Sequence, residues 1–142
     1  MSEMLAAILC GQLERANKIN KQRILIYERY DSELADWSYK HGVLTPPHVS
    51  DCTHTAHVFH LRFSQGAMRD RFVSHLSERG ISAVFHYQPL HLSKVGIGLG
   101  GYRGQCPVTE HAGDCLIRLP LFNTLMPAEQ TRVIEAVASF VP

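Results

Sequence analysis

The 142-residue sequence predicts an α+β fold in which helices pack on a small three-stranded sheet and a long helix leads the chain. Residues 3–35 carry apolar side chains mostly at steps of three or four, which is the spacing of one helix face. Three shorter runs, at 56–63, 81–87 and 115–122, have the length and apolar content of strands. We expect a single domain over residues 1–142, with the long helix at about 3–35 and an α+β sandwich at about 56–141.

The first half of the predicted long helix is unusually apolar. The stretch LAAILCGQL, residues 5–13, has apolar side chains on nearly every side, and such a helix is normally covered on every side. Nothing before it in the chain could cover it, and monomers rarely leave such patches exposed. We therefore expect this segment to pack against another part of a larger protein or against a second copy.

Breaker residues separate the remaining elements. A Pro-rich connector at 42–50 follows the long helix, and Gly80 suits the residue after a second helix that starts near 67. The glycine-rich segment 92–106 is expected to be a loop, and Pro107 suits the start of a short helix. Pro127 opens the last helix. Its N-cap position is occupied by Met126, which lacks a capping oxygen at an expected cost of about 1 kcal/mol.

Composition excludes several classes of function. A net charge of +1 gives no electrostatic signature for nucleic acid or an anionic membrane surface. No apolar run approaches the roughly 20 residues that span a bilayer. The four cysteines show no CxxC spacing, which is typical of reduced thiols in a cytoplasmic protein.

The end of the second strand, VFHYQPLH at 84–91, is a candidate site. Pro89 cannot donate to a strand ladder, so pairing must stop and leave His86, Tyr87 and His91 where the chain exits the sheet. Arg118 interrupts the apolar run CLIRLPLF, and a charge there must either pair with a carboxylate or face a cleft. On these residues alone, ordinary strand-end side chains and a structural ion pair remain open.

Two further motifs are weaker. His54, His57 and His60 are three residues apart, but on a strand such steps alternate between faces, which disfavours a shared metal ion. GIGLGG at 96–101 matches the dinucleotide pattern GxGxxG, yet no clear strand precedes it and no helix is expected after it. We expect neither a metal site nor a dinucleotide site here.

Four segments give the chain a recognisable pattern: SEMLAAILCGQLERANKIN, AHVFHLRF, RDRFVSHLSERGISAVFHYQPLH and TEHAGDCLIRLPLFNTLMPAEQTRVIEAV. In this order they resemble the DegT/StrS-type sugar aminotransferases. The resemblance implies the small C-terminal domain of a fold-type I enzyme, starting partway along the helix that joins two domains. The large domain that binds pyridoxal phosphate (PLP) would be absent, along with the Schiff-base lysine. None of Lys18, Lys21, Lys40 and Lys94 lies in a stretch that resembles the cofactor segment.

The resemblance also implies substrates and partners. The complete enzyme would use PLP to move an amino group from glutamate to a dTDP-4-keto-6-deoxyhexose for surface-polysaccharide or lipopolysaccharide synthesis, and would form a dimer. His86, Tyr87 and His91 would contact the nucleotide sugar or shape its entrance, and Arg118 would help to bind either the anionic amino donor or the nucleotide phosphates. No residue of this chain would be catalytic. We expect the chain alone to bind no cofactor and to be inactive. The alternative is a non-catalytic interaction module, a split-gene partner or remnant that self-associates through its N-terminal helix.

Overall fold

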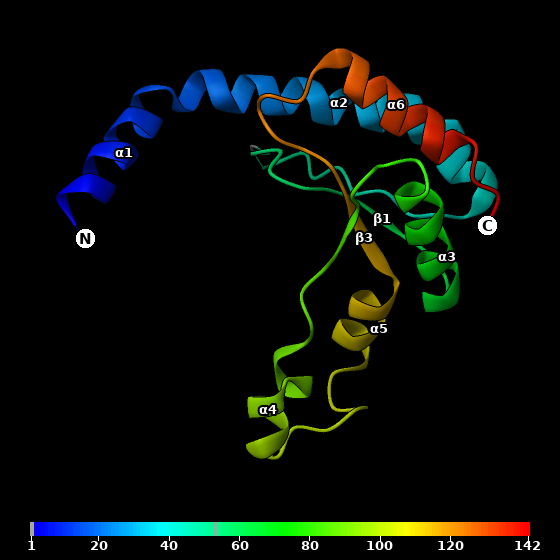
Figure 1. The fold of residues 1–142 in the computed structure, drawn as a ribbon. Helices are drawn as coiled ribbons and strands as arrows, with labels where there is room; N and C mark the ends of the chain where they lie inside the picture. Colours follow the sequence, from blue (N-terminus) through cyan, green and yellow to red (C-terminus); the bar gives the residue numbers. More distant parts are fainter. Residues whose placement is uncertain (1, 53) are drawn as a thin grey trace.

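The computed structural model describes residues 2–52 and 54–142, and its architecture is the predicted α+β fold (Figure 1). Three short antiparallel strands form a sheet in the order β1-β3-β2. The strands are β1 Phe59–Arg62, β2 Val84–Phe85 and β3 Leu116–Leu119. The helices are α1 Glu3–Glu14, α2 Ala16–His41, α3 Gly66–Ser77, the 3-10 helix η1 Leu90–Leu92, α4 Lys94–Gly98, α5 Pro107–Cys115 and α6 Pro127–Ala138.

The predicted single helix at 3–35 is two helices and is longer than expected. At Arg15 the N–H group bonds to the carbonyl of Gln12, a tighter turn that separates α1 from α2. The second helix continues to His41 because Trp37 is buried, with its indole N–H donating to the Phe140 carbonyl at 2.9 Å. Gly42, in the left-handed conformation at φ 63°, then ends the helix.

All three strands are shorter than their apolar runs. Pro120 lacks an N–H donor, and β3 ends one residue before it. The predicted strand at 81–87 is reduced to two residues, because its partner β3 begins only at Leu116, directly after α5. Antiparallel pairing therefore has no extended partner for the residues that follow His86.

The core lies between one face of the sheet and helices α2, α3 and α6. Alternate residues of the strands point into it and are buried, namely Phe59, Leu61, Ile117 and Leu119. The α6 helix lies along α2 (Figure 1), and Gln130 donates from α6 to the Ile26 carbonyl of α2 at 2.7 Å. Glu129 accepts the Met126 N–H at 2.9 Å, which is the reciprocal half of a capping box. Met126 itself makes no side-chain capping bond to the first turn of α6, so the capping interaction that we expected to be missing is absent.

The glycine-rich segment 92–106 is only partly the loop that its composition predicts: it begins with the last residue of η1 and contains α4, whereas 99–106 are turns and irregular chain. Together residues 90–106 form what we call the α4 lobe, at the end of the molecule farthest from α2 (Figure 1). Ser93 caps α4 by accepting the Gly96 N–H at 3.0 Å. A Cβ atom at Gly96 would overlap the Leu90 carbonyl oxygen, and one at Gly101 would overlap the His91 carbonyl oxygen. These glycines are therefore required by close backbone packing.

The α1 helix projects from the body of the molecule (Figure 1). It has no buried residue, and its large apolar side chains are 43–75% exposed: Met4, Leu5, Ile8, Leu9 and Leu13. In the described part of the chain, no helix combines the length and apolar character required to cross a bilayer.

Candidate functional site

The end of β2 brings three of the four predicted site residues together. His86 and Tyr87 follow the last paired residue, Phe85, and their rings make an edge contact at 5.4 Å between centroids. The guanidinium of Arg118, on the neighbouring strand β3, lies 5.0 Å from the centre of the Tyr87 ring. Its Nη2 group donates to the Phe85 carbonyl at 3.1 Å. Arg118 therefore orients the exit of the chain from the sheet by a hydrogen bond and a cation–π contact.

These three side chains remain accessible to a ligand. Tyr87 is 73% exposed, and His86 is exposed at the mouth of a pocket of about 480 Å³. The pocket lies between α3, the segment after β2 and α5, and its lining includes Arg69, Asp70, Phe85, Gln88, Arg103 and Asp114. Partial desolvation lowers the pKa of His86, and the charge of Arg118 lowers it further. A neutral imidazole can both donate and accept a hydrogen bond, as recognition of a hydroxylated ligand requires.

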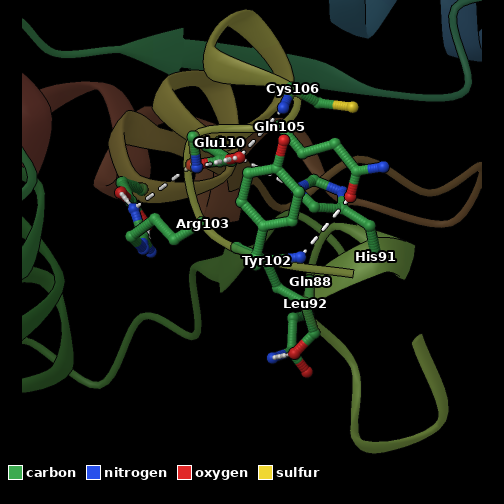
Figure 2. Close-up of polar contacts among 10 residues, drawn as sticks. Gln88, His91, Leu92, Tyr102, Arg103, Gln105, Cys106 and Glu110 are labelled. Carbon is green, nitrogen blue, oxygen red and sulfur yellow. Dashed lines mark hydrogen bonds and ion pairs between the residues drawn. The ribbon is translucent and has the colours of Figure 1, made fainter. Parts of the chain in front are cut away.

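The fourth predicted residue, His91, lies in a different environment. Its Nε2 atom is 2.9 Å from Oε1 of Glu110, and the two side chains are only 15% and 6% exposed. Figure 2 shows this pair inside a set of contacts that joins the α4 lobe to α5. The Nε2 atom of His91 is therefore occupied by a contact within the protein, and this contact helps to position the α4 lobe.

Glu110 is the residue that the sequence did not single out. Its carboxylate accepts the Gly104 N–H at 2.9 Å and the Cys106 N–H at 3.1 Å, in addition to its contact with His91 (Figure 2). The Gly104 bond is the main cause, followed by the His91 bond, of a pKa lowered to about 2. Glu110 lies in the polar stretch TEHAGD, where nothing in the local pattern distinguishes a buried carboxylate from an exposed one.

The three spaced histidines do not meet. The His54 ring packs on Tyr27 at 4.4 Å and its Nδ1 accepts the Ala56 N–H, whereas His60 lies on the sheet opposite Arg118. Within residues 2–52 and 54–142, no three His, Cys, Asp or Glu side chains lie close enough to hold a metal ion. The GIGLGG segment is partly helical and packs on its own backbone, and it follows the 3-10 helix η1 rather than a strand. This is not the strand–loop–helix geometry of a dinucleotide site.

Comparison with known proteins identifies the family. The sequence model of the DegT/DnrJ/EryC1/StrS aminotransferase family matches residues 1–138. The chain belongs to this family. A relative, the "pleiotropic regulatory protein" of Geobacillus stearothermophilus, is 33% identical over 141 residues, which are 99% of this chain and 37% of the relative.

Solved structures of the family have the same fold as this chain. DesV of S. venezuelae superposes with a TM-score of 0.88 at 32% identity, over 100% of this chain and 38% of DesV. Spr1654 of Streptococcus pneumoniae, which has been solved in a PLP form, gives 0.87 at 25% identity, over 98% and 35%. The chain therefore corresponds to the C-terminal portion of PLP-dependent sugar aminotransferases and spans just over a third of their length.

Proposed function

We propose that this chain is the C-terminal part of a cytoplasmic PLP-dependent transaminase whose substrate is a dTDP-4-keto-6-deoxyhexose. The closest activity would be that of dTDP-4-amino-4,6-dideoxygalactose transaminase. Glutamate would give its amino group to the C4 ketone, so that each turnover yields one amino sugar and one 2-oxoglutarate. Family membership and the alignment of the chain with the C-terminal third of sugar aminotransferases support this proposal.

We propose that the residues of this chain do not by themselves form a PLP site. The cofactor requires a lysine amine in an enclosed site, and it supplies the capacity to carry the amino group between the two substrates. All four lysines, Lys18, Lys21, Lys40 and Lys94, are exposed, and none lines either of the two pockets that lie beside β2 and α2. We therefore propose that a large domain supplies the cofactor and the catalytic lysine, and that the complete protein is a homodimer.

The role of this chain would be to form one wall of the substrate cleft. The observation that carries this role is the cluster of His86, Tyr87 and Arg118, which is accessible and fixed to the sheet. The imidazole of His86 and the hydroxyl of Tyr87 would hydrogen-bond to the sugar nucleotide, and the Tyr87 ring would offer a flat surface for stacking. His91 would shape the entrance indirectly, through the position of the α4 lobe.

The direct test extends the chain at its N-terminus with the adjoining coding sequence from its source. The extended protein, saturated with PLP, is assayed by mass spectrometry for glutamate-dependent amination of dTDP-4-keto-6-deoxyglucose. We expect an amino sugar and 2-oxoglutarate from the extended protein and neither from the 142-residue chain. An adjoining sequence that encodes no lysine-bearing domain, or a PLP-loaded protein without product, would contradict the proposed reaction.

The same assay tests the cleft residues. We expect His86→Ala to lower kcat/KM for the nucleotide sugar by about tenfold, because hydrogen bonds to substrate are lost while an exposed side chain contributes little to the fold. His57→Ala removes an exposed imidazole elsewhere and is the matched control. Equal kinetics for the two variants would exclude His86 from the cleft.

The uncovered α1 helix favours a second candidate, a non-catalytic module that docks on a separate protein. Its apolar side chains would then be covered by a partner chain rather than by a domain of the same chain. Stable self-association of the 142-residue chain, together with the absence of a cofactor-binding domain in the adjoining sequence, would support this candidate over the transaminase.

A further inference from the structure

The face of the sheet opposite the helical core remains accessible and is unusually basic. Residues that alternate with the buried core positions, including His60 and Arg62 on β1 and Arg118 on β3, are only half-buried. Val84, which lies opposite Arg118 on β2, is 50% exposed. We call the group formed by His60, Arg62, His86 and Arg118 the polar sheet face.

Strand register brings these side chains together. His60 lies directly opposite Arg118, and Arg62 lies opposite Leu116, so the two arginines occupy diagonal positions about 7–8 Å apart. His86 immediately follows the last residue of β2 on the other side of β3. Burial lowers the pKa of His60, and the nearby charges of His86 and Arg62 lower it further, as expected of clustered basic groups.

The two arginines have no acidic partner among the residues that the structure describes. No ion pair in the described part of the chain includes Arg62 or Arg118. The Nε atom of Arg118 is buried and therefore cannot reach a ligand, and its Nη2 group donates to the Phe85 carbonyl. The rest of this half-buried guanidinium, and that of Arg62, retains capacity to bind an anion.

We propose that the polar sheet face binds the diphosphate of the sugar nucleotide. Arg62 can hold one phosphate through its planar fork, and Arg118 can donate to a second phosphate through the N–H groups that its bond to Phe85 leaves free. Their diagonal separation suits two linked phosphates better than one carboxylate. His60 and His86, on either side of Arg118, would donate further hydrogen bonds to the phosphate oxygens. The assignment rests on the proposed function for the identity of the nucleotide, whereas the anion site itself depends only on these four side chains.

The test uses the 142-residue chain, so that it is independent of transaminase activity. Inorganic pyrophosphate and dTDP are titrated into ¹⁵N-labelled chain, and dissociation constants are taken from the amide shifts of β1 and β3. We expect both probes to shift the same amides and to compete, and we expect Arg118→Gln and Arg62→Gln each to weaken binding by about tenfold. Lys21→Gln, which removes an exposed positive charge from α2, should change neither dissociation constant.

Three results would overturn the assignment. An anion site is excluded if neither pyrophosphate nor dTDP shifts the amides of β1 and β3. It is also excluded if both probes bind equally well to Arg118→Gln and Lys21→Gln. Glutamate that displaces pyrophosphate at equal concentration would show that the face recognises a carboxylate instead of a diphosphate. Failure of the amination assay with intact pyrophosphate binding would contradict the proposed reaction and leave the anion site in place.

Discussion

The Nε2 atom of His91 and the Oε1 atom of Glu110 lie 2.9 Å apart in a largely enclosed setting. This pair connects η1 to α5 across 19 positions of the sequence, and the same carboxylate accepts two backbone N–H groups from the turn at 104–106. One carboxylate that satisfies three donors thus helps to hold the α4 lobe, together with the ion pair between Arg103 and Asp114 at 2.9 Å. The attachment of the lobe to the body is polar, in contrast to the apolar packing among α2, α3 and α6.

Glu110→Gln should loosen the α4 lobe without unfolding the core. The amide retains one acceptor but loses the charge and places an N–H₂ group where donors converge. We expect the amide protons of Gly104 and Cys106 to exchange with solvent about tenfold faster, while those of α2 are unchanged. Glu135→Gln, on the exposed side of α6, is the control. Equal protection in both variants would show that the carboxylate does not hold the lobe.

The stability of the chain should decrease in acid through Glu110. Its pKa is about 2 in the folded chain and near the ordinary 4.5 when unfolded, so the unfolded state binds the proton more readily. The contribution is fully present above about pH 4.5 and is lost as the pH falls toward about 2. Urea unfolding between pH 2 and 6 should give a shallower acid slope for Glu110→Gln than for the wild type. Parallel slopes would contradict this assignment.

Gly96 and Gly98 look equivalent in the sequence, but they should respond oppositely to substitution by alanine. Alanine at 96 overlaps the Leu90 carbonyl oxygen and should disrupt the lobe, visible as displaced amide signals across residues 90–106. Alanine at 98 meets open space within α4 and should be neutral or stabilising by about 0.5–1 kcal/mol. Similar spectra for the two variants would exclude a close-packed lobe.

Tyr30→Phe should lower the free energy of unfolding by about 1–2 kcal/mol, because the Pro120 carbonyl loses its donor in a buried position. The Tyr30 hydroxyl lies 2.9 Å from that carbonyl and ties α2 to the end of β3. Tyr39→Phe removes a hydroxyl from a side chain that is 91% exposed and should have no measurable effect. Chemical denaturation of the two variants side by side provides the measurement.

The 142-residue chain should self-associate through α1, since five large apolar side chains are uncovered on that helix. Leu5→Lys or Leu9→Lys should reduce this association in sedimentation velocity over a range of concentrations. Gln12→Lys adds the same charge at an exposed polar position of α1 and should leave the association unchanged. A wild-type chain that stays monomeric at high concentration would contradict the prediction.

Local sequence patterns were sufficient for the fold class and for the alternation of buried and accessible residues along β1. Phe59 and Leu61 are buried and His60 is not, because the side-chain period of a strand is a local property. A glycine at position 42 was also a sequence signal for the end of a helix, and it would have corrected the expected boundary at residue 35. In the structure Gly42 ends α2 in the left-handed conformation.

The site was less predictable, because its contacts join distant residues. His91 was expected to contact the nucleotide sugar or to shape its entrance, but its contact with Glu110 was not foreseen, because the two residues lie on different elements and no local pattern reveals such a pair. The α4 lobe was mistaken for a loop for a related reason. Glycine content indicates flexibility in isolation, whereas here Gly96 and Gly101 permit close contact with a backbone several residues away. Arg118 stood out in the sequence because a charge inside an apolar strand is a local anomaly, and its role in binding stays a prediction.

The uneven burial of α2 gives the leading helices a mechanical property. Residues 2–23 include no fully buried side chain, whereas α2 is fixed to the core from Ile26 onward. Helix α1 and the start of α2 thus form a lever arm of roughly 30 Å pivoting near Ile26. A rotation of about 10° at that pivot displaces the tip by roughly 5 Å, so small adjustments of the core are amplified at whatever surface α1 contacts.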